Sequence, residues 1–163
     1  MPPDDLGALS GHEGNRQRAW HRSGVLSRRG DRELQQITGD AASHYDVAFA
    51  SIAFVDAGTE ILVARCGIFF WENPRSTSFC AIAIQKPGEP LVVGNAAEDS
   101  RFADYATVCE PPFVRFYAGM SIMDRAGYAL GALCVADPKP RTSTADVIQL
   151  MLYAREVERV LRR

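Results

Sequence analysis

The chain has 163 residues, of which 47% are hydrophobic and 23% are charged, the composition of an ordinary globular domain. Its formal net charge of −2 excludes the strong basic excess that is typical of nucleic-acid-binding proteins. No apolar run in the sequence approaches the ~20 residues that a membrane span requires, so we expect neither a nucleic acid nor a membrane as partner.

The first segment, residues 1–29, contains Pro, Gly, Ser, His and Arg without helical or strand periodicity. Such a pattern predicts a flexible, arginine-rich leader without a fold of its own. Residues 30–163 are then expected to form a single domain.

Helical spacing begins after Asp31, a residue that can cap a helix through its side chain. Apolar residues recur on one face of this predicted helix up to Tyr45. Residues 47–55 and 61–65 are two apolar runs around a turn, and they predict a buried hairpin. Residues 67–74 have no clear period, and we expect a loop whose aromatic side chains cover the sheet.

Ser76, Thr77 and Ser78 offer caps for a short helix over residues 79–84, and residues 91–93 are typical of a short strand. A polar connector over residues 95–102 follows, with one expected helical turn.

Two runs, residues 113–122 and 127–137, predict a central hairpin. Period-two alternation puts Arg115 and Tyr117 on one face, and Gly119 and Gly131 indicate close approach of another group. The last segment contains a regular apolar stripe over residues 147–161, preceded by a capping box of Ser143 and Asp146, and it predicts a terminal helix.

Several short motifs occur in an order that resembles the bacterial GAF domain, in the branch found in sensor kinases and diguanylate cyclases. The motifs are Ser78-Phe79-Cys80, Leu91-Val92-Val93, Asp99-Ser100-Arg101-Phe102, Val114 to Gly119, and Leu133-Cys134-Val135. The resemblance covers about residues 31–161. It implies an α+β fold in which five or six antiparallel strands have the first and last helices on one face. Loops and short helices form a pocket on the other face.

Members of that family bind cyclic nucleotides, haem, bilins or small metabolites, and many dimerise through the helical face. This chain departs from the branch at Asn95, Ile82 and Ser121, where Asp, His and Pro are usual. It lacks the Asn-Lys-Phe-Asp-Glu signature of cyclic-nucleotide binders and the Cys-His pair that attaches a bilin. We therefore expect neither of these ligands, and the cofactor is unknown.

The candidate pocket residues come from these motifs. They are Phe79, Cys80, Asn95, Asp99, Arg101, Phe102, Arg115 and Tyr117. In the functional interpretation, Arg101 or Arg115 binds an anionic ligand and Tyr117 orients it. In the alternative, which we favour because the motifs recur in members with different ligands, Asp99 caps its turn and pairs with an arginine while Phe102 anchors the core.

The four cysteines are widely spaced, with no C-x-x-C pair, no zinc pattern and no secretory signal before them. We expect reduced thiols in a cytoplasmic protein. Cys80, near a helix N-terminus, is a candidate for a lowered pKa. Some GAF proteins reduce free methionine sulfoxide with a cysteine pair, for which Cys66 and Cys109 are the candidate partners, whereas Cys134 reads as a core residue.

Three hypotheses follow. We favour a stand-alone, non-enzymatic GAF-like sensory module that binds an unidentified small molecule, forms a homodimer through its terminal helices, and signals to a partner protein. The second is a structural dimerisation domain whose cavity is filled by aromatic residues of the 67–74 loop and by Phe79. The third is the reductase, which requires two thiols with Cα atoms no more than about 7 Å apart.

Overall fold

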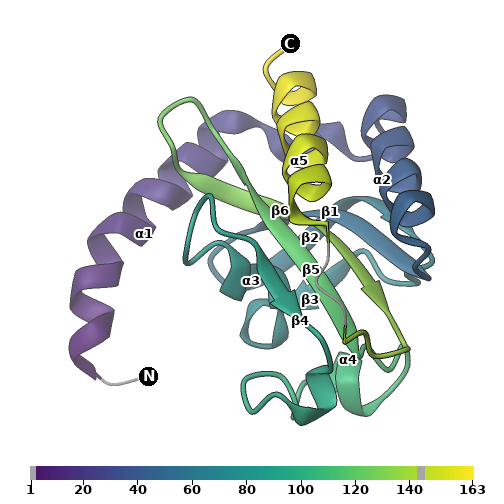
Figure 1. The fold of residues 1–163 in the computed structure, drawn as a ribbon. Helices are drawn as coiled ribbons and strands as arrows, with labels where there is room; N and C mark the ends of the chain where they lie inside the picture. Colours follow the sequence, from purple (N-terminus) through teal and green to yellow (C-terminus); the bar gives the residue numbers. More distant parts are fainter. Residues whose placement is uncertain (1–2, 143–145) are drawn as a thin grey trace.

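Six strands form one antiparallel sheet in the order β3-β2-β1-β6-β5-β4 (Figure 1). The computed structural model describes residues 3–142 and 146–163. The strands are β1 (Phe49–Val55), β2 (Thr59–Cys66), β3 (Glu72–Pro74), β4 (Leu91–Val93), β5 (Phe116–Met123) and β6 (Ala129–Asp137). The α-helices are α1 (Pro3–Ser23), α2 (Arg32–Tyr45), α3 (Phe79–Ala83), α4 (Ala106–Cys109) and α5 (Val147–Leu161). The 3₁₀ helices are η1 (Val25–Arg28), η2 (Arg75–Thr77) and η3 (Ala96–Glu98).

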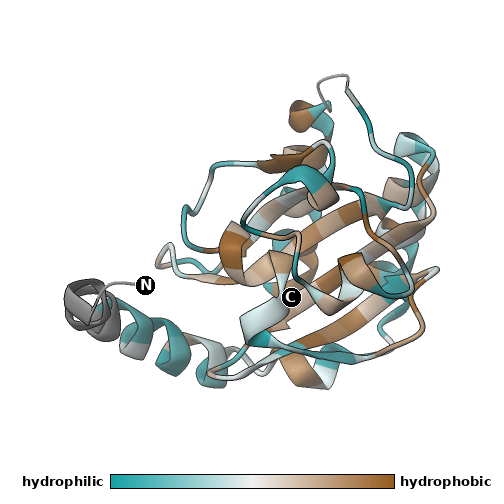
Figure 2. Cartoon of the chain, turned by 90° about the horizontal axis from the view of Figure 1, so that it is seen from below, coloured by the Kyte–Doolittle hydropathy of each residue, from teal (hydrophilic) through white to brown (hydrophobic). Residues whose placement is uncertain are grey.

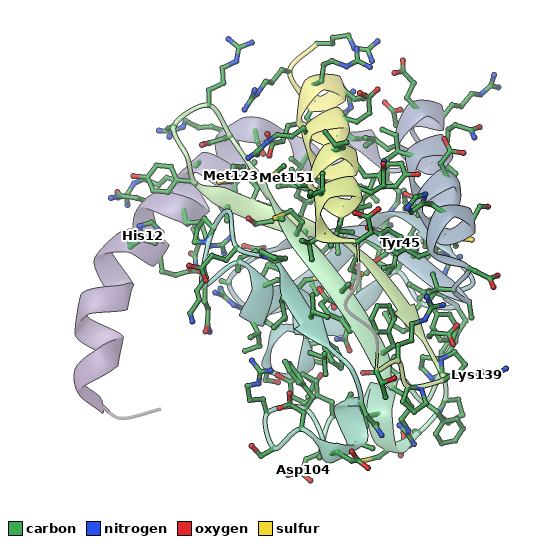
Figure 3. All side chains as sticks on the ribbon, viewed as in Figure 1. His12, Tyr45, Asp104, Met123, Lys139 and Met151 are labelled. Carbon is green, nitrogen blue, oxygen red and sulfur yellow. The ribbon has the colours of Figure 1, made fainter. Side chains whose placement is uncertain are left out.

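One face of the sheet is covered by α2 and α5, which lie side by side in Figure 1. Both helices confirm the predicted apolar stripes, because α2 buries Leu34 and α5 buries Leu150 against the strands. Asp31 caps α2 as predicted, accepting hydrogen bonds from the first backbone N–H groups. The Tyr45 hydroxyl donates to the Asp146 carbonyl and joins the end of α2 to the start of α5 (Figure 3). Asp146 is the residue that caps α5, while the predicted cap Ser143 lies outside the described residues.

The other face is covered by α3, η3, α4 and the loops around them. Figure 2 shows hydrophobic residues concentrated along the strands, between these two layers. Successive residues along a strand point to opposite faces of the sheet, so that Phe116 packs against the helices while Tyr117 packs against the loops. The predicted α+β sheet with helices on one face and short elements on the other is confirmed.

The N-terminal segment differs from the sequence prediction, which was wrong in expecting no secondary structure there. Residues Pro3–Ser23 form α1, and a 3₁₀ turn, η1, follows it. Arg16, Ala19 and Trp20 recur at helical spacing and are buried against the domain. Tertiary packing of this short stripe therefore holds a helix that the polar composition conceals.

Charged groups fix α1 to the domain. Arg16 is 2% exposed, and its guanidinium group donates to the Ala129 carbonyl at 3.3 Å and pairs with Glu13 at 2.8 Å. Glu13 also accepts a hydrogen bond from Arg75. Burial alone would raise the pKa of Glu13, but the hydrogen bonds from Arg16 and Arg75 lower it to about 2. The ionised carboxylate thus links α1 to the β3–α3 connection.

Two smaller differences occur in the predicted loops. Residues 72–74 form the edge strand β3, which pairs with the start of β2. The polar connector contains the expected helical turn, η3, and is followed by the further short helix α4. Both elements are short: β3 depends on its pairing with β2, whereas α4 is a single turn closed by local hydrogen bonds.

The central hairpin of β5 and β6 is confirmed, and so are its close contacts. A Cβ atom on Gly131 would lie 2.0 Å from the carbonyl oxygen of Ala53 on β1, closer than any real Cβ contact. A Cβ atom on Gly119 would lie 2.3 Å from the hydroxyl of Tyr117. At these two positions glycine is needed for space.

We predict that Gly131→Ala lowers the free energy of unfolding by roughly 1–3 kcal/mol or more, because β1 and β6 must separate to admit the methyl group. Gly39→Ala, in α2 with no atom within 4 Å of the added Cβ, is the matched control and should raise it by roughly 0.5–1 kcal/mol. Urea denaturation of the two variants checks both. Equal stability of Gly131→Ala and the wild type would contradict this account.

Candidate functional site

A cavity of about 60 Å³ lies on the sheet face opposite α2 and α5. Most of its wall is apolar, and this part is formed mainly by Phe49, Leu62, Ile68, Phe70, Phe79 and Ala136. The remaining wall is polar or carries thiols, and it is formed by Ser51, Glu60, Asn73, Cys80, Thr107, Tyr117 and Cys134. An apolar enclosure with a few convergent polar groups is the usual form of a small-molecule site.

The polar groups of the cavity contact one another in pairs. Ser51 Oγ and Cys134 Sγ are 3.0 Å apart, and the Tyr117 hydroxyl is 3.5 Å from Cys80 Sγ. Asn73 Nδ2 donates to Glu60 Oε2 at 3.1 Å. Thr107 Oγ1 is buried and has no hydrogen-bond partner among the described residues, so it is available to a bound molecule.

Local structure explains how α3 reaches the cavity. The Ser78 hydroxyl accepts a hydrogen bond from the Ala81 N–H at 3.1 Å and starts the helix. Phe79 then stacks between Phe102 and Tyr117, with ring centroids 4.4 and 4.8 Å away. This aromatic stack makes one wall of the cavity rigid.

The lack of a side chain at Gly119 leaves space for the phenol ring of Tyr117. Tyr117 and Gly119 are two residues apart on β5 and share a face. Because Gly119 has no side chain, the Tyr117 hydroxyl can lie over its Cα and meet Cys80. Burial raises the pKa of Tyr117 well above its ordinary value, so the hydroxyl stays protonated.

The thiol of Cys80 does not have the lowered pKa that its helix position suggested. Hydrogen bonding to the Cys134 thiol and burial raise the pKa of Cys80 well above its ordinary value. Its helix, α3, has only five residues, and the surroundings supply no positive charge to a thiolate. The expectation was therefore wrong, and Cys80 is a neutral thiol.

The second thiol in the cavity is Cys134, where the sequence suggested Cys66 or Cys109. Cys109 is exposed and bonds to the Ala103 carbonyl, and Cys66 packs on the helical side of the sheet. All four cysteines are free thiols.

Glu60 is the buried carboxyl group of the site, with 7% of its surface exposed. Burial raises the pKa of Glu60, an effect only partly opposed by hydrogen bonds with Asn73, Cys80 and Ser78. Among the described residues no Lys, Arg or His forms an ion pair with it. A buried carboxyl group without a cationic partner is costly to fold, and such groups concentrate at functional sites.

Of the candidate residues taken from the sequence, the structure brings Phe79, Cys80 and Tyr117 together at the cavity. Phe102 is fully buried behind Phe79.

The other four candidates lie outside the cavity wall. Asn95 caps η3 through its side chain. Asp99 forms an exposed ion pair with Arg101 at 2.8 Å, and that hydrogen bond lowers the pKa of Asp99. Arg115 donates to the carbonyls of Val108 and Val114 at 2.9 and 3.0 Å. In this structure these side chains hold the connector between β4 and β5.

Sequence reasoning missed five polar members of the cavity, namely Ser51, Glu60, Asn73, Thr107 and Cys134. A signal for Glu60 was present, because it alternates with Ile61 and so shares the face of the buried Leu62. Thr107 and Asn73 come from elements that the sequence did not predict.

No helix among residues 3–142 and 146–163 is long and apolar enough to cross a membrane. In the same part of the chain, no group of three or more His, Cys, Asp or Glu is arranged to hold a metal ion.

An antiparallel sheet with helices on one face and a loop-enclosed cavity on the other defines an α+β domain with a candidate small-molecule site. The GAF domain model matches residues 30–161, and the chain belongs to the GAF domain family. GAF domains are commonly sensory or regulatory.

Individual relatives agree with this assignment. The chain is 35% identical over 147 residues to a cyclic di-GMP phosphodiesterase of Pseudomonas aeruginosa; the match covers 89% of this chain but only 25% of that protein.

Solved structures share the fold at low identity. The GAF domain of an Acinetobacter phosphoenolpyruvate-protein phosphotransferase is 18% identical, with a TM-score of 0.64 and 93% of each chain covered. A type II free methionine-R-sulfoxide reductase from Thermoplasma acidophilum is 13% identical, with a TM-score of 0.66 and coverage of 83% of this chain and 93% of that one.

We predict that Glu60→Gln changes the pH dependence of stability. Because folding raises the pKa of Glu60 above its ordinary value of 4.5, the folded state holds this proton more tightly than the unfolded chain. The wild type therefore loses stability as the pH rises from 4.5 through the raised pKa, whereas the variant does not. In urea denaturation across this pH range, the free energy of unfolding of Glu60→Gln should increase relative to that of the wild type as the pH rises.

The matched control is Glu72→Gln, which removes an exposed carboxylate on the adjacent strand β3. Its stability difference from the wild type should vary less with pH. A Glu60→Gln difference that is constant across the whole range would contradict the burial argument.

Proposed function

We propose that this chain is a sensory module that binds a small molecule in the cavity and regulates another domain or protein. The observation that carries the proposal is the cavity, where hydrogen-bonding groups from β1, β2, β3, β5, β6 and α4 converge within an apolar wall. Thr107 Oγ1 supports it further, because its position leaves a buried hydroxyl for a ligand to satisfy.

The strands offer a route from the cavity to the helices. On β6, Cys134 and Ala136 face the cavity, while Leu133 and Val135 contact the layer that contains α2 and α5. A ligand that shifts β6 would therefore change helix packing on the far side, because close-packed cores transmit small displacements.

The relationship to the Pseudomonas enzyme supports a regulatory role within a larger signalling context. This chain corresponds to about a quarter of that protein, as a regulatory domain does. Cyclic di-GMP is a poor candidate for the cavity, since a volume of about 60 Å³ is well below the roughly 300–1,000 Å³ of typical ligand sites.

Self-association is the companion proposal. Helix α5 exposes two large apolar side chains one turn apart, Ile148 at 66% and Leu152 at 53%. Residues at this spacing lie on the same helical face. We propose that this face pairs with a second copy of the chain.

Ligand binding is tested by thermal unfolding of the purified chain against small metabolites. A compound at a hundred times its Kd should stabilise the wild type by about 2.7 kcal/mol. Tyr117→Phe should reduce this stabilisation, because it removes a hydroxyl from the cavity wall. Arg101→Ala, which changes an exposed side chain, is the control and should retain it.

Two outcomes would overturn the proposal. If no compound stabilises a chain that is dimeric, a structural dimerisation domain is the better account. If the protein instead reduces free methionine sulfoxide with a thiol reductant, and Cys80→Ser abolishes turnover, the chain is a reductase that uses the adjacent Cys80 and Cys134 thiols.

Dimerisation is tested by sedimentation velocity over a range of protein concentrations. We expect a dimer for the wild type and a monomer for the double variant Ile148→Glu, Leu152→Glu, because charges on the contact face cannot be buried without cost. Phe69→Glu changes an equally exposed apolar residue, 70% exposed, and should leave the dimer intact. A wild-type monomer at every concentration would refute the proposed interface.

A further inference from the structure

The charge balance of the cavity indicates what kind of molecule it takes. Glu60 is the carboxyl group in the wall, and no Lys, Arg or His is found among the described residues that line the cavity. An ionised Glu60 would have no positive charge beside it. An anionic ligand would add a second negative charge to the same apolar enclosure, which is unfavourable at low dielectric constant.

Aromatic rings surround the same space. Phe49, Phe70, Phe79 and Tyr117 all contribute to the wall. Both faces of Phe79 are covered by Phe102 and Tyr117, so Phe49 and Phe70 are the rings whose faces can meet a ligand. The faces of such rings carry partial negative charge and attract cations, most strongly when water is excluded. The Glu60 carboxylate and the aromatic rings therefore both favour a positively charged ligand.

Hydrogen-bond acceptors complete the arrangement. Glu60 accepts a hydrogen bond from Asn73 at 3.1 Å and is also within hydrogen-bonding reach of Cys80 and Ser78, whereas a carboxylate has about four acceptor positions in all. Thr107 Oγ1 has no partner among the described residues and can accept another hydrogen bond. A group with two or three N–H donors fits these acceptors.

Volume limits the size of the ligand. The cavity of about 60 Å³ has room for a few water molecules, at roughly 10–15 Å³ for each. A molecule of about two to four heavy atoms fits without movement of the loops. Amino acids with long side chains, nucleotides and tetrapyrroles are larger than this space.

We infer that the cavity binds a small organic cation, a protonated alkylamine, with its ammonium group against Glu60 and its alkyl group against the aromatic wall. The inference rests on the proposed sensory function and names the ligand class for that site. Binding brings a positive charge to the carboxyl group and favours its ionised form.

A dependence on pH follows from this geometry. The titratable groups that face Glu60 are the Cys80 and Cys134 thiols and the Tyr117 hydroxyl. The pKa values of Cys80 and Tyr117 are raised well above their ordinary values, mainly by hydrogen bonding to Cys134 for Cys80 and by burial for Tyr117, so both groups stay neutral near pH 7. An alkylamine, like the lysine side chain with a pKa of about 10.4, stays protonated there. Raising the pH from 4.5 through the raised pKa of Glu60 ionises the carboxyl group, and the affinity should therefore increase.

The experiment is a titration of the ¹⁵N-labelled chain with ethylammonium chloride, followed by NMR, with ethanol, sodium acetate and sodium chloride as neutral, anionic and salt controls. We expect amide shifts on β5 and β6 around Tyr117 and Cys134 with ethylammonium alone. For so small a ligand the Kd should be on the order of 1 mM.

The variants separate the charge from the cavity. Glu60→Gln keeps the shape, and it should weaken ethylammonium binding by about 10- to 100-fold. Glu72→Gln should bind as the wild type does. The amide spectrum of each variant reports whether it is folded, and the pH series on the wild type tests the charge without any substitution.

The outcomes distinguish this inference from the proposed function. If ethanol or acetate binds at the same amides and ethylammonium does not, the cavity is a ligand site but the cation inference is wrong. Ethylammonium binding that is unchanged in Glu60→Gln, or that does not vary with pH, also overturns it. If ethylammonium fails while a larger metabolite stabilises the chain through Tyr117, the sensory function stands and this ligand class is rejected.

Discussion

Burial of β6 on both faces is the constraint on which the rest of the domain depends. All nine of its residues are buried, so the strand is stable only when one layer covers each side of the sheet. The helices α2 and α5 form one layer, and the short elements between β2 and β5 form the other. Gly131 allows β1 to approach β6 closely enough to close this core. The cavity lies where the second, less regular layer meets the strands.

Short-range patterns were sufficient to predict the sheet and its two long helices. The apolar stripes of α2 and α5 and the two hairpins are local signals, and the Asp31 cap needs only three neighbouring residues. The prediction for residues 1–29 was wrong because the structure of that segment depends on long-range contacts. Its helix is held by Arg16 and Trp20 against parts of the chain distant in sequence, and a polar, arginine-rich composition gives no sign of such contacts.

The candidate site was predictable only in part, because the motifs contain residues that support the loops as well as residues that line the cavity. Asp99 and Arg101 pair with each other, and Arg115 binds backbone carbonyls, so these residues support the loop that closes the second layer. Glu60, by contrast, lines the cavity but was not selected, because a charged residue beside a turn is usually exposed to solvent. Its burial depends on β3, α3 and the loops, whose positions come from tertiary packing alone.

The two walls of the cavity differ in a way that suits a sensor. One wall is formed by Phe79 and Tyr117, whose rings are fixed by their stacking, by Phe102 behind Phe79 and by the close approach of Gly119. The other is formed by loop residues such as Phe70 and Pro112, and loops deform at lower cost than paired strands. A ligand held against the fixed wall by Glu60 would draw the loop wall inward. The carboxyl group of Glu60 that destabilises the free domain would then cause the conformational response. A bound cation pairs with the buried charge and so stabilises the closed conformation of the loops.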